Sequence, residues 1–550
     1  MKISKSKNKS DSVVVLSKIP RKSSPPTPSD SDTFVTHDVT APDGHCDTSP
    51  MMTCANETPT QPKVSQLKMT TDDGERCAGK NSERNNEADR NSRKKYRQTN
   101  GEINENHYWK ASITSRDDNK IRQALDEADS LLAENNLNQA LSAFLQLTHT
   151  YKRSPRSHYG LAQTLDRLSE QQQSNSLLEE SLKEYEKVLR LSNVPVALFK
   201  NAADRFVDRG RFRGVWNRVL NVQRELCDKF PNDHELFNNY GITFLMMGRN
   251  DDAKRVFKDV LLRDPTNHVA EAHLGFILKT VDDLLSEGAW YLKRGINSDA
   301  PGTQDARFYY HAGDALQRLG RNNEAYEIYA KGAKVGLFIS TYQRSLYNVN
   351  GLMSRPFWQL NQTGSEKILK LIEKNWRIIR DESLELVNSA TGLFLKEDEK
   401  LTNAGDWRQF TLYQRGVKLE QNCHRVPRTC QILSRFTEAV SCTRGQIKLS
   451  ILHPGTRIHS HCGPTNCRLR AHLGLVVPTD PTGPMLRVAN HPPVQWTEGR
   501  FMIFDDSFEH EVWWPKPAET TIDPIFRLVL IVDFWHPDLN AAQKSSLVPI

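Results

Sequence analysis

The residue types best suited to chemistry are two histidines and an arginine near the C-terminus. His461 lies in the stretch HCGPTNCRLRAHLGL, His510 lies in FDDSFEHEVW, and Arg527 begins the apolar run that continues as LVLIVDF. Two histidines on separate segments can bind a redox-active metal, and an arginine in an apolar run can pair with a carboxylate. These residues indicate an Fe(II) oxygenase that uses a dicarboxylate cosubstrate.

The histidine pair departs from the usual pattern of non-haem iron sites. Such sites normally add a carboxylate to the two histidines, here expected two residues after His461, where the chain has Gly463. Either the two histidines hold the metal alone or no iron binds. A zinc hydrolase would need a third ligand such as Cys462 or Cys467. Cys462 adjoins His461 and would point to the opposite face of a strand.

The charges near the histidines also need partners. The guanidinium of Arg527 is costly to bury unless it is paired, and a 2-oxo dicarboxylate supplies a bidentate partner. An internal salt bridge to Asp533 is the alternative. Alternation along the chain places Arg468, Arg470 and His472 on one face of a strand. Inside a barrel this row would favour anionic ligands, both a dicarboxylate and an acidic substrate side chain.

Short β-rich runs separated by Pro, Gly and Asp turns surround these residues. The predicted strands cover 446–452, 468–477, 486–488, 500–503, 511–514 and 526–534. Several short strands of this kind predict a sandwich or a jelly-roll barrel, with both histidines at or near strand ends. The apolar spacing in residues 364–387 predicts one amphipathic helix before the barrel.

A helical repeat precedes the β-rich region. From about residue 116 the apolar residues fall at three- and four-residue steps. Gly241 recurs as Gly275, and Pro231 recurs as Pro265, each 34 positions later. A helix-turn-helix unit of this length resembles the tetratricopeptide repeat, whose stacked pairs form a solenoid with a concave face. Peptide binding in that groove and a simple spacing role both remain open.

The composition limits the remaining function classes. The formal charge of +7 comes from 74 basic and 67 acidic residues, and the densest basic cluster lies at 93–97 in a polar tract. Because a nucleic-acid binder concentrates basic residues on one face, we expect no nucleic-acid partner. No apolar run reaches about 18 residues, so we predict no transmembrane segment, and the N-terminus does not resemble a signal peptide.

Together these features predict a multidomain α + β protein. Residues 1–115 are rich in Ser, Thr, Asp, Asn, Lys and Pro, and we expect them to be disordered. The other predicted parts are the tetratricopeptide-like solenoid at 116–345, a helical connector at 346–395, the barrel domain at 396–540 and a tail at 541–550.

The C-terminal motifs resemble a known family. The stretches HPGTRIHSHCGPTNCRLRAHLGLVVP, FDDSFEHEVW and FRLVLIVDFWHPDL are similar to the aspartyl/asparaginyl β-hydroxylases, which are Fe(II)- and 2-oxoglutarate-dependent oxygenases. The resemblance runs from Gly405 to Leu539 and implies a double-stranded β-helix. It implies dioxygenase hydroxylation of the β-carbon of Asp or Asn side chains in epidermal-growth-factor-like domains. The alternative is a tetratricopeptide scaffold whose barrel is degenerate and not catalytic.

The resemblance also implies roles for individual residues. Iron would be bound by His461 and His510, and Gly463 fits because this family dispenses with the usual carboxylate. The residues implied to hold 2-oxoglutarate are Ser450, Arg470, His472 and Arg527. The residues implied to contact the substrate polypeptide are Asp398, Glu399, Gln409 and Arg468, and Arg470 is the alternative to Arg468. Asp506 would hydrogen-bond to a water on the open metal position, unless it only caps a turn.

The cysteines bear on the compartment. Cys423 and Cys430 flank the turn-like sequence HRVPRT, and a small disulfide loop would form there in an oxidising compartment. The resemblance implies both this disulfide and a location in the lumen of the endoplasmic reticulum. No signal or anchor is visible in the sequence, so the cytoplasm is the alternative.

Overall fold

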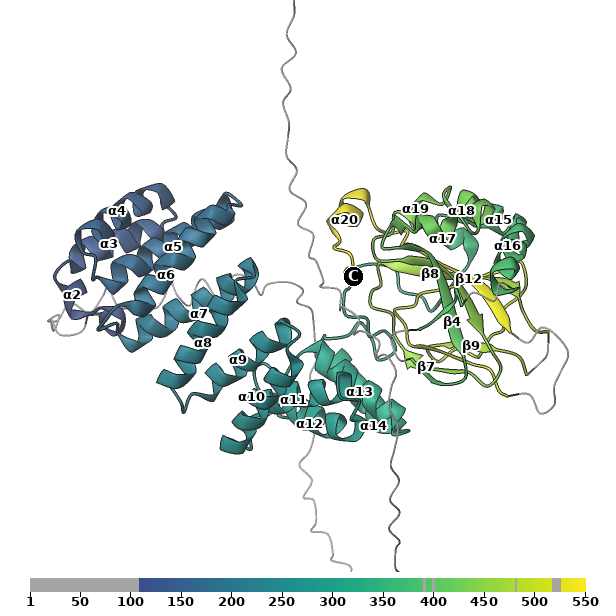
Figure 1. Ribbon diagram of the computed structural model, residues 1–550, viewed down its shortest axis with the longest axis horizontal. Coiled ribbons are helices and arrows are strands. Elements are labelled where there is room, and N and C mark those ends of the chain that lie inside the picture. The colour runs from purple at the N-terminus through teal and green to yellow at the C-terminus, as the bar shows by residue number, and fades with distance from the viewer. Residues whose placement is uncertain (1–107, 389–391, 398–400, 480–481, 517–525) are drawn as a thin grey trace, which may run out of the picture. The chain divides into compact units, whose positions relative to one another are not determined.

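The computed structural model of the protein describes residues 108–388, 392–397, 401–479, 482–516 and 526–550 (Figure 1). The predicted disordered tail lies almost entirely outside the described residues. The first described elements are η1 (Ala111–Ile113) and α2 (Arg116–Asn119), so regular structure begins slightly before the predicted boundary at residue 115. A capping box between Ser115 and Asp118 starts α2.

A succession of helices confirms the predicted solenoid. Each helix packs against the next one along the chain (Figure 1). The helices are α3 (Arg122–Ala133), α4 (Leu137–Thr150), α5 (Pro155–Gln171), α6 (Asn175–Arg190), α7 (Val196–Arg213), α8 (Trp216–Lys229), α9 (His234–Met246), α10 (Asn250–Arg263), α11 (His268–Thr280), α12 (Leu285–Asn297), α13 (Ala306–Arg318) and α14 (Asn322–Lys334).

The repeated glycines explain why the helix pairs pack closely. A Cβ atom at Gly241 in α9 would lie 2.7 Å from the ring of Phe257 in α10, and one at Gly313 in α13 would overlap Tyr329 in α14. The turn between α9 and α10 contains Gly248 with a φ of 70°, a left-handed conformation that glycine adopts without strain. The same contact of a glycine with an aromatic ring therefore recurs in these two helix pairs, whereas Gly275 in α11 lies against the backbone of α12.

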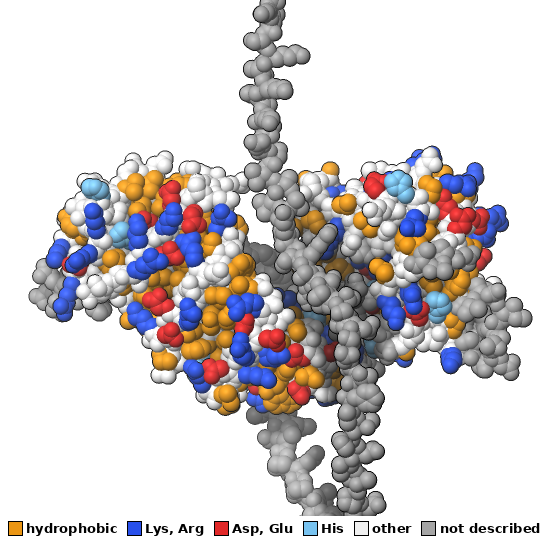
Figure 2. All heavy atoms as spheres, viewed as in Figure 1, with side chains coloured by type: hydrophobic (Ala, Val, Ile, Leu, Met, Phe, Trp, Pro, Cys, Tyr) orange, Lys and Arg blue, Asp and Glu red, His pale blue; other side chains and the backbone are white. Residues whose placement is uncertain are grey.

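Charged side chains of both signs are interspersed over the solenoid face seen in Figure 2. Many of them pair across neighbouring helices. Arg218 of α8, for example, contacts Glu179 and Glu186 of α6 at 2.6 and 3.0 Å. These side chains are partly buried, and ion pairs near a protein surface typically contribute only about 0–1 kcal/mol each, so the apolar contacts between helices hold the solenoid together. In the described ranges, no helix is long and apolar enough to cross a membrane.

The C-terminal region consists of two antiparallel sheets. The main sheet has the strand order β1-β10-β8-β12-β6-β4-β2, with β5 paired to β4, and the second sheet has the order β3-β7-β11-β9. The strands are β1 (Phe357–Trp358), β2 (Leu395–Lys396), β3 (Thr402–Ala404), β4 (Trp407–Gln414), β5 (Val417–Lys418), β6 (Gln446–Leu452), β7 (Arg457–His461), β8 (Arg468–Val476), β9 (Met485–Val488), β10 (Phe501–Phe504), β11 (His510–Trp513) and β12 (Arg527–Trp535). Two sheets of this kind confirm the predicted sandwich or jelly-roll domain, and all the pairs among these strands are antiparallel.

The two faces of the main sheet have different environments. Leu528 and Leu530 of β12 belong to an apolar core with the helices on the outer side of the sheet. These helices are α15 (Glu366–Lys374), α16 (Trp376–Asn388), α17 (Glu420–Cys423), α18 (Pro427–Leu433) and α19 (Thr437–Val440). The inner face packs against the second sheet through Val529 and Ile531, and it also carries Arg527. Because β12 is buried along its whole length, the charges on its inner face lie inside the protein.

Several element predictions differ from the structure. The single helix predicted at 364–387 is two helices, α15 and α16, which meet at Asn375; the Asn375 side chain donates to the Leu371 carbonyl at 2.8 Å. Strands β1 and β2 come from the predicted helical connector and join the main sheet. The predicted C-terminal tail contains a further helix, α20 (Ala541–Ser546), which Asn540 caps.

Candidate functional site

The two predicted metal-binding histidines lie side by side. His461 is the last residue of β7, His510 is the first residue of β11, and they are direct partners in the antiparallel pairing of these strands. Their ring centroids are 4.3 Å apart. Side chains of direct cross-strand partners project from the same face, which explains the close approach. The prediction that both histidines lie at strand ends is confirmed.

Hydrogen bonds fix the orientation of both imidazoles. Nδ1 of His461 is 2.7 Å from the carbonyl oxygen of His459, and Nδ1 of His510 is 2.9 Å from that of Phe508. A carbonyl can only accept, so each Nδ1 carries the proton and each Nε2 carries the lone pair that binds metals. Burial, and then the neighbouring His461, hold the pKa of His510 well below its usual value. His510 is therefore neutral at pH 7, the form that binds a metal.

The glycine in place of the usual carboxylate has a steric cause. A Cβ atom at Gly463 would lie 2.4 Å from Oδ2 of Asp506 and 2.9 Å from its carbonyl oxygen. The Gly463 N–H also donates to that carbonyl at 2.6 Å. A side chain at position 463 would collide with Asp506, because the Asp506 carboxylate occupies the space beside Gly463. The predicted hydrogen bond from Asp506 to a metal-bound water stays a prediction.

The arginine row on β8 is neutralised within the protein. Nη2 of Arg468 lies 2.6 Å from Oδ2 of Asp506, and Arg470 binds Asp533 through Nε and Nη2 at 2.7 and 2.9 Å. Burial alone would raise the pKa of Asp506, but Arg468 and Arg470 outweigh burial and lower it. For Arg468 and Arg470, the expectation that the row needs an external anion is therefore wrong, because both find carboxylate partners within the chain. The alternative that Asp533 pairs with Arg527 is also wrong, because Asp533 forms its ion pairs with Arg470 and Arg468.

Arg527 is buried without a carboxylate partner among the described residues. Its Nη2 donates to Oγ of Ser450 at 3.1 Å, and its guanidinium carbon lies 4.5 Å from the centroid of the Trp496 ring. Its Nε has no hydrogen-bond partner in the part of the chain that the structure describes. Burial lowers the pKa of Arg527 to about 9, with no carboxylate to oppose that effect. An anionic ligand would supply the missing partner.

His472 offers a second donor beside Arg527. Trp496 Nε1 donates to Nδ1 of His472 at 3.2 Å, so the proton of His472 is on Nε2. That Nε2 is buried and has no partner within the described ranges. Burial, and then the charge of Arg527, hold the pKa of His472 well below its usual value. Two unsatisfied buried N–H donors, one charged and one neutral, fit a carboxylate ligand.

The remaining predicted contacts lie at different distances from this site. Gln409 of β4 is the direct strand partner of Ser450 and is half-buried on the same face. Arg468 is enclosed by Asp506, Asp533 and the Arg444 carbonyl, which hold its guanidinium. Asp398 and Glu399 lie outside the described residues. The roles predicted for all four residues stay predictions.

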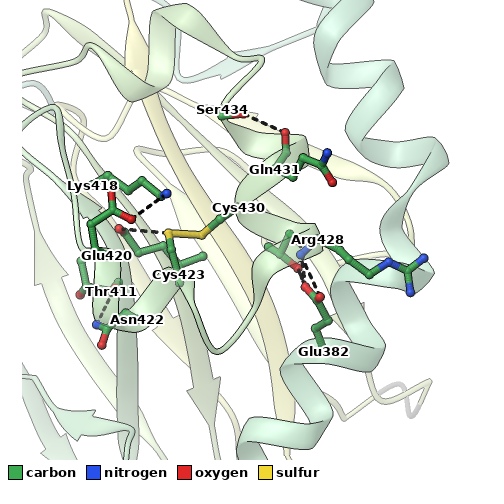
Figure 3. Close-up of a disulfide and its surroundings, with 12 residues drawn as sticks. Glu382, Thr411, Lys418, Glu420, Asn422, Cys423, Arg428, Cys430, Gln431 and Ser434 are labelled. Atoms are coloured by element: carbon green, nitrogen blue, oxygen red, sulfur yellow. Dashed lines mark hydrogen bonds and ion pairs between the residues drawn. A yellow bond between two sulfur atoms is a disulfide. The ribbon is translucent and has the colours of Figure 1, made fainter.

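The predicted disulfide is formed. Cys423 in α17 and Cys430 in α18 are bonded, with their Cα atoms 5.6 Å apart (Figure 3). Beside them, Glu382 of α16 accepts hydrogen bonds from the backbone N–H groups of Arg428 and Thr429 at 2.9 and 2.7 Å. A carboxylate at a helix N-terminus is favourable, so this contact fixes α18 and its cysteine against α16.

Sequence reasoning missed residues that complete the site. Trp496 lies in a loop without periodicity, and no sequence signal relates it to Arg527 or His472. Trp407, whose Nε1 donates to Ser450 at 2.9 Å, is also found only through the pairing of β4 with β6. Across the described stretches, no group of three or more His, Cys, Asp or Glu side chains is placed to hold a metal. The zinc alternative therefore has no third ligand there.

Known proteins with similar sequences fall into one family. Residues 373–537 match the family model described as Aspartyl/Asparaginyl beta-hydroxylase, and residues 306–335, which cover α13 and α14, match a tetratricopeptide repeat model. The aspartyl/asparaginyl beta-hydroxylases of Homo sapiens and Mus musculus are each 46% identical over 441 residues, which is 80% of this chain. The chain spans 57% of the human protein and 58% of the mouse protein.

A second kind of relative matches a shorter part of the chain. Aspartate beta-hydroxylase domain-containing protein 2 of Mus musculus is 36% identical over 182 residues, which is 32% of this chain and 51% of that protein. The similarity to the human and mouse hydroxylases extends over the helices as well, because it covers far more of the chain.

Proposed function

Because residues 373–537 match the aspartyl/asparaginyl β-hydroxylase family model and the chain is 46% identical to the human enzyme over 441 residues, we propose that it is an Fe(II)- and 2-oxoglutarate-dependent dioxygenase. It hydroxylates the β-carbon of Asp or Asn side chains in protein substrates. The observation that carries the proposal is the close pair of oriented histidines, His461 and His510, in the same β domain as the buried, carboxylate-free Arg527.

The residues present fit an iron site. His461 and His510 would bind Fe(II) through Nε2, because each Nδ1 is occupied by a backbone carbonyl. The iron, when bound, supplies the redox chemistry that activates dioxygen. Asp506 would hold a water near the metal, and its own bonds to Arg468 keep that carboxylate in a fixed position. The Nδ1 bonds fix the rings, as second-shell contacts do at other metal sites.

The residues present also fit a dicarboxylate. Arg527 would bind the distal carboxylate of 2-oxoglutarate, assisted by Ser450, whose hydroxyl lies 3.1 Å from Arg527 Nη2. His472 would donate a hydrogen bond from its buried Nε2–H group to the same ligand. Arg470 is also proposed to contact the cosubstrate, and its two bonds to Asp533 hold its guanidinium in place.

The proposed substrates are polypeptides that contain epidermal-growth-factor-like domains. The support is the similarity to enzymes named for aspartyl and asparaginyl hydroxylation, together with a helical solenoid that is suited to binding peptides. Gln409 is a proposed substrate contact, and its position beside Ser450 on the inner face supports that proposal. Asp398, Glu399 and Arg468 are proposed contacts from the family resemblance.

The proposed location is the lumen of the endoplasmic reticulum. The Cys423–Cys430 bond supports it, since disulfides persist in oxidising compartments and are rare in the cytosol. Trapping of unpaired thiols with an alkylating reagent immediately on cell lysis, followed by mass spectrometry, tests this. Recovery of both cysteines in the alkylated form would favour the cytoplasm.

The test of the proposed function is turnover by a His510→Ala variant. Wild-type protein with Fe(II), 2-oxoglutarate and a peptide from an epidermal-growth-factor-like domain should release succinate, and the peptide should gain the mass of one oxygen atom. Both signals should vanish in His510→Ala. His491→Ala, which changes an exposed histidine of the same domain, should retain them. Equal turnover by His510→Ala and the wild type would refute the assignment.

Gly463 also leaves a second candidate, a non-catalytic scaffold with a degenerate barrel. In that case the solenoid would bind the partner proteins, and the two histidines would contribute only to the packing of the β domain. Titration of the purified chain with Fe(II) without oxygen separates the two. Binding of one iron per chain at micromolar concentration, lost in His461→Ala, would exclude the scaffold.

A further inference from the structure

One carboxylate connects the solenoid to both histidines. Glu509 immediately precedes His510, and its buried side chain accepts four hydrogen bonds. The donors are Gln317 Nε2 at 3.1 Å, Tyr326 Oη at 2.8 Å, Arg344 Nη1 at 2.6 Å and Ser460 Oγ. Gln317 lies on α13 and Tyr326 on α14, which form the last helical repeat. Ser460 immediately precedes His461, so the same carboxylate bonds beside both candidate ligands.

Neighbouring residues hold these donors in place. Tyr329 Oη donates to Oε1 of Gln317 at 2.8 Å, which turns the amide so that its NH₂ group faces Glu509. The guanidinium of Arg344 lies 3.6 Å from the centroid of the Tyr329 ring, and its Nη1 also donates to the Thr341 carbonyl at 2.7 Å. Contacts other than those with Glu509 therefore hold the side chains of Gln317 and Arg344 in place.

The chain that follows the last repeat also holds the segment leading to His510. The Glu509 N–H donates to the carbonyl of Tyr342 at 2.6 Å, and Gln343 forms an isolated β-bridge with Phe508. Gln343 Nε2 donates to Oγ of Ser507 at 2.8 Å. The carbonyl of Phe508 is the one that accepts from Nδ1 of His510. Contacts from residues 342–343 therefore fix the backbone group that orients this imidazole.

The same contacts compensate the buried charge of Glu509. Its Oε2 pairs with Nη1 of Arg344 at 2.6 Å, and its Oε1 accepts the other three hydrogen bonds. A buried carboxylate that loses its partners is strongly destabilised. Three of the four donors belong to the last repeat or to the chain directly after it. All four hydrogen bonds to Glu509 therefore form only when the last repeat contacts the β domain.

We propose that Glu509 is a positioning residue through which the last helical repeat holds His461 and His510 in metal-binding geometry. This inference rests on the proposed function, because it assumes that the two histidines bind a metal. Glu509 does not touch the metal itself; it acts through Ser460 and through the backbone around His510. Disturbing α13 or α14 should therefore weaken metal binding although neither helix supplies a ligand.

The test measures Co(II) binding to the full chain, because the visible absorption of bound Co(II) reports both its affinity and its ligand geometry. In Glu509→Gln, an NH₂ group replaces one acceptor and opposes the donors. Loss of a second-shell partner typically weakens metal binding about 10-fold to 100-fold, and we expect that loss with an altered spectrum. Glu511→Gln is the matched control: Glu511 is also buried beside His510, but its partners Arg487 and Arg457 belong to the two strands that flank β11.

Two milder variants keep the test decisive if Glu509→Gln does not fold. Tyr326→Phe and Gln317→Ala each remove one donor from the solenoid, and each should weaken Co(II) several-fold at unchanged thermal stability of the barrel. Arg344→Lys keeps the charge and should retain more affinity than Arg344→Gln. Wild-type affinity and spectrum in folded Tyr326→Phe and Gln317→Ala would overturn the inference. Absence of Co(II) binding by the wild type would instead overturn the proposed function.

Discussion

The inner face of the main sheet has buried charges at both ends, and the two ends are balanced in different ways. At one end, Arg468 and Arg470 are paired with Asp506 and Asp533 at distances from 2.6 to 3.2 Å. At the other end, Arg527 has only the hydroxyl of Ser450 and the ring of Trp496 among its described contacts. Both ends belong to the same strands, β8 and β12, so the fold alone does not require the difference.

The difference indicates which arginine depends on a ligand for its counter-charge. Removing a charge from water is costly unless a partner in good geometry compensates, and the first end supplies that partner from within the chain. The second end leaves a charge and the buried Nε2 proton of His472 unsatisfied, an arrangement that lowers stability and suits binding. His510 influences the pKa of both Asp506 and His472, so this proposed metal ligand is electrostatically linked to both ends.

The largest expected effect comes from breaking the balanced end. Asp533→Asn removes the charge that Arg470 and Arg468 share, and breaking one partner of a buried ion pair costs about 3–5 kcal/mol. We expect the free energy of unfolding, measured by urea denaturation at pH 7, to fall by about that amount. Asp538→Asn, at a half-exposed position after the same strand, should change it little. A loss below about 1 kcal/mol would mean that ion pairing does not hold this end.

Much of the fold follows from local pattern. The strand at 446–452 and the strand that begins near Arg527 were predicted closely, because they have long apolar or alternating sequences that are buried. Strand β7 was missed, because RIHSH has one apolar residue and forms a strand only through pairing with β3 and β11. The break at Asn375 was also missed, since the apolar spacing continues across it.

The residues of the site could be predicted from the sequence, but the ion pairs and hydrogen bonds between them could not. Alternation correctly placed Arg468, Arg470 and His472 on one face of β8. Their carboxylate partners come from distant positions, and only the register of β12 against β8 brings Asp533 to Arg470. Likewise, the family resemblance could explain Gly463 only as a missing ligand, whereas the structure attributes it to the volume of Asp506.

The next largest effect should come from the unbalanced end. Arg527→Met removes the proposed partner of the distal carboxylate, and we expect 2-oxoglutarate to bind about 100-fold more weakly, as losing one partner of a buried charged pair does. Calorimetric titration without oxygen measures this. Arg428→Met, at an exposed position, is the control.

The same variant should behave differently from Asp533→Asn in stability. Because Arg527 is buried without a described carboxylate partner, replacing it with an apolar side chain should leave the ligand-free thermal midpoint unchanged or higher. A large drop in that midpoint would show that Arg527, like Asp533, stabilises the ligand-free protein.

A smaller effect should follow from adding one carbon atom at the balanced end. In Gly463→Ala, the new Cβ would meet Oδ2 of Asp506 at 2.4 Å, so the carboxylate or the backbone must shift. Overpacking of this kind costs about 1–3 kcal/mol. We expect a lower thermal midpoint together with weaker Co(II) binding, because the displaced Asp506 lies close to His510. Wild-type values for both quantities would show that Asp506 has room to move.

The smallest effect concerns His472, which belongs to the unbalanced end. Its folded-state pKa is held well below 6.5, first by burial and then by Arg527, whereas the unfolded chain has a pKa near 6.5. Below about pH 6.5 the unfolded state therefore binds a proton that the folded state does not, and the free energy of unfolding falls on acidification by up to about 1.4 kcal/mol per pH unit for this group. Urea denaturation from pH 7.5 to 5.5 should show a shallower fall in His472→Gln, since glutamine does not titrate. Equal slopes for the variant and the wild type would mean that His472 also takes up a proton in the folded protein. That uptake requires an anionic partner, so His472 would then not be an unsatisfied group beside Arg527.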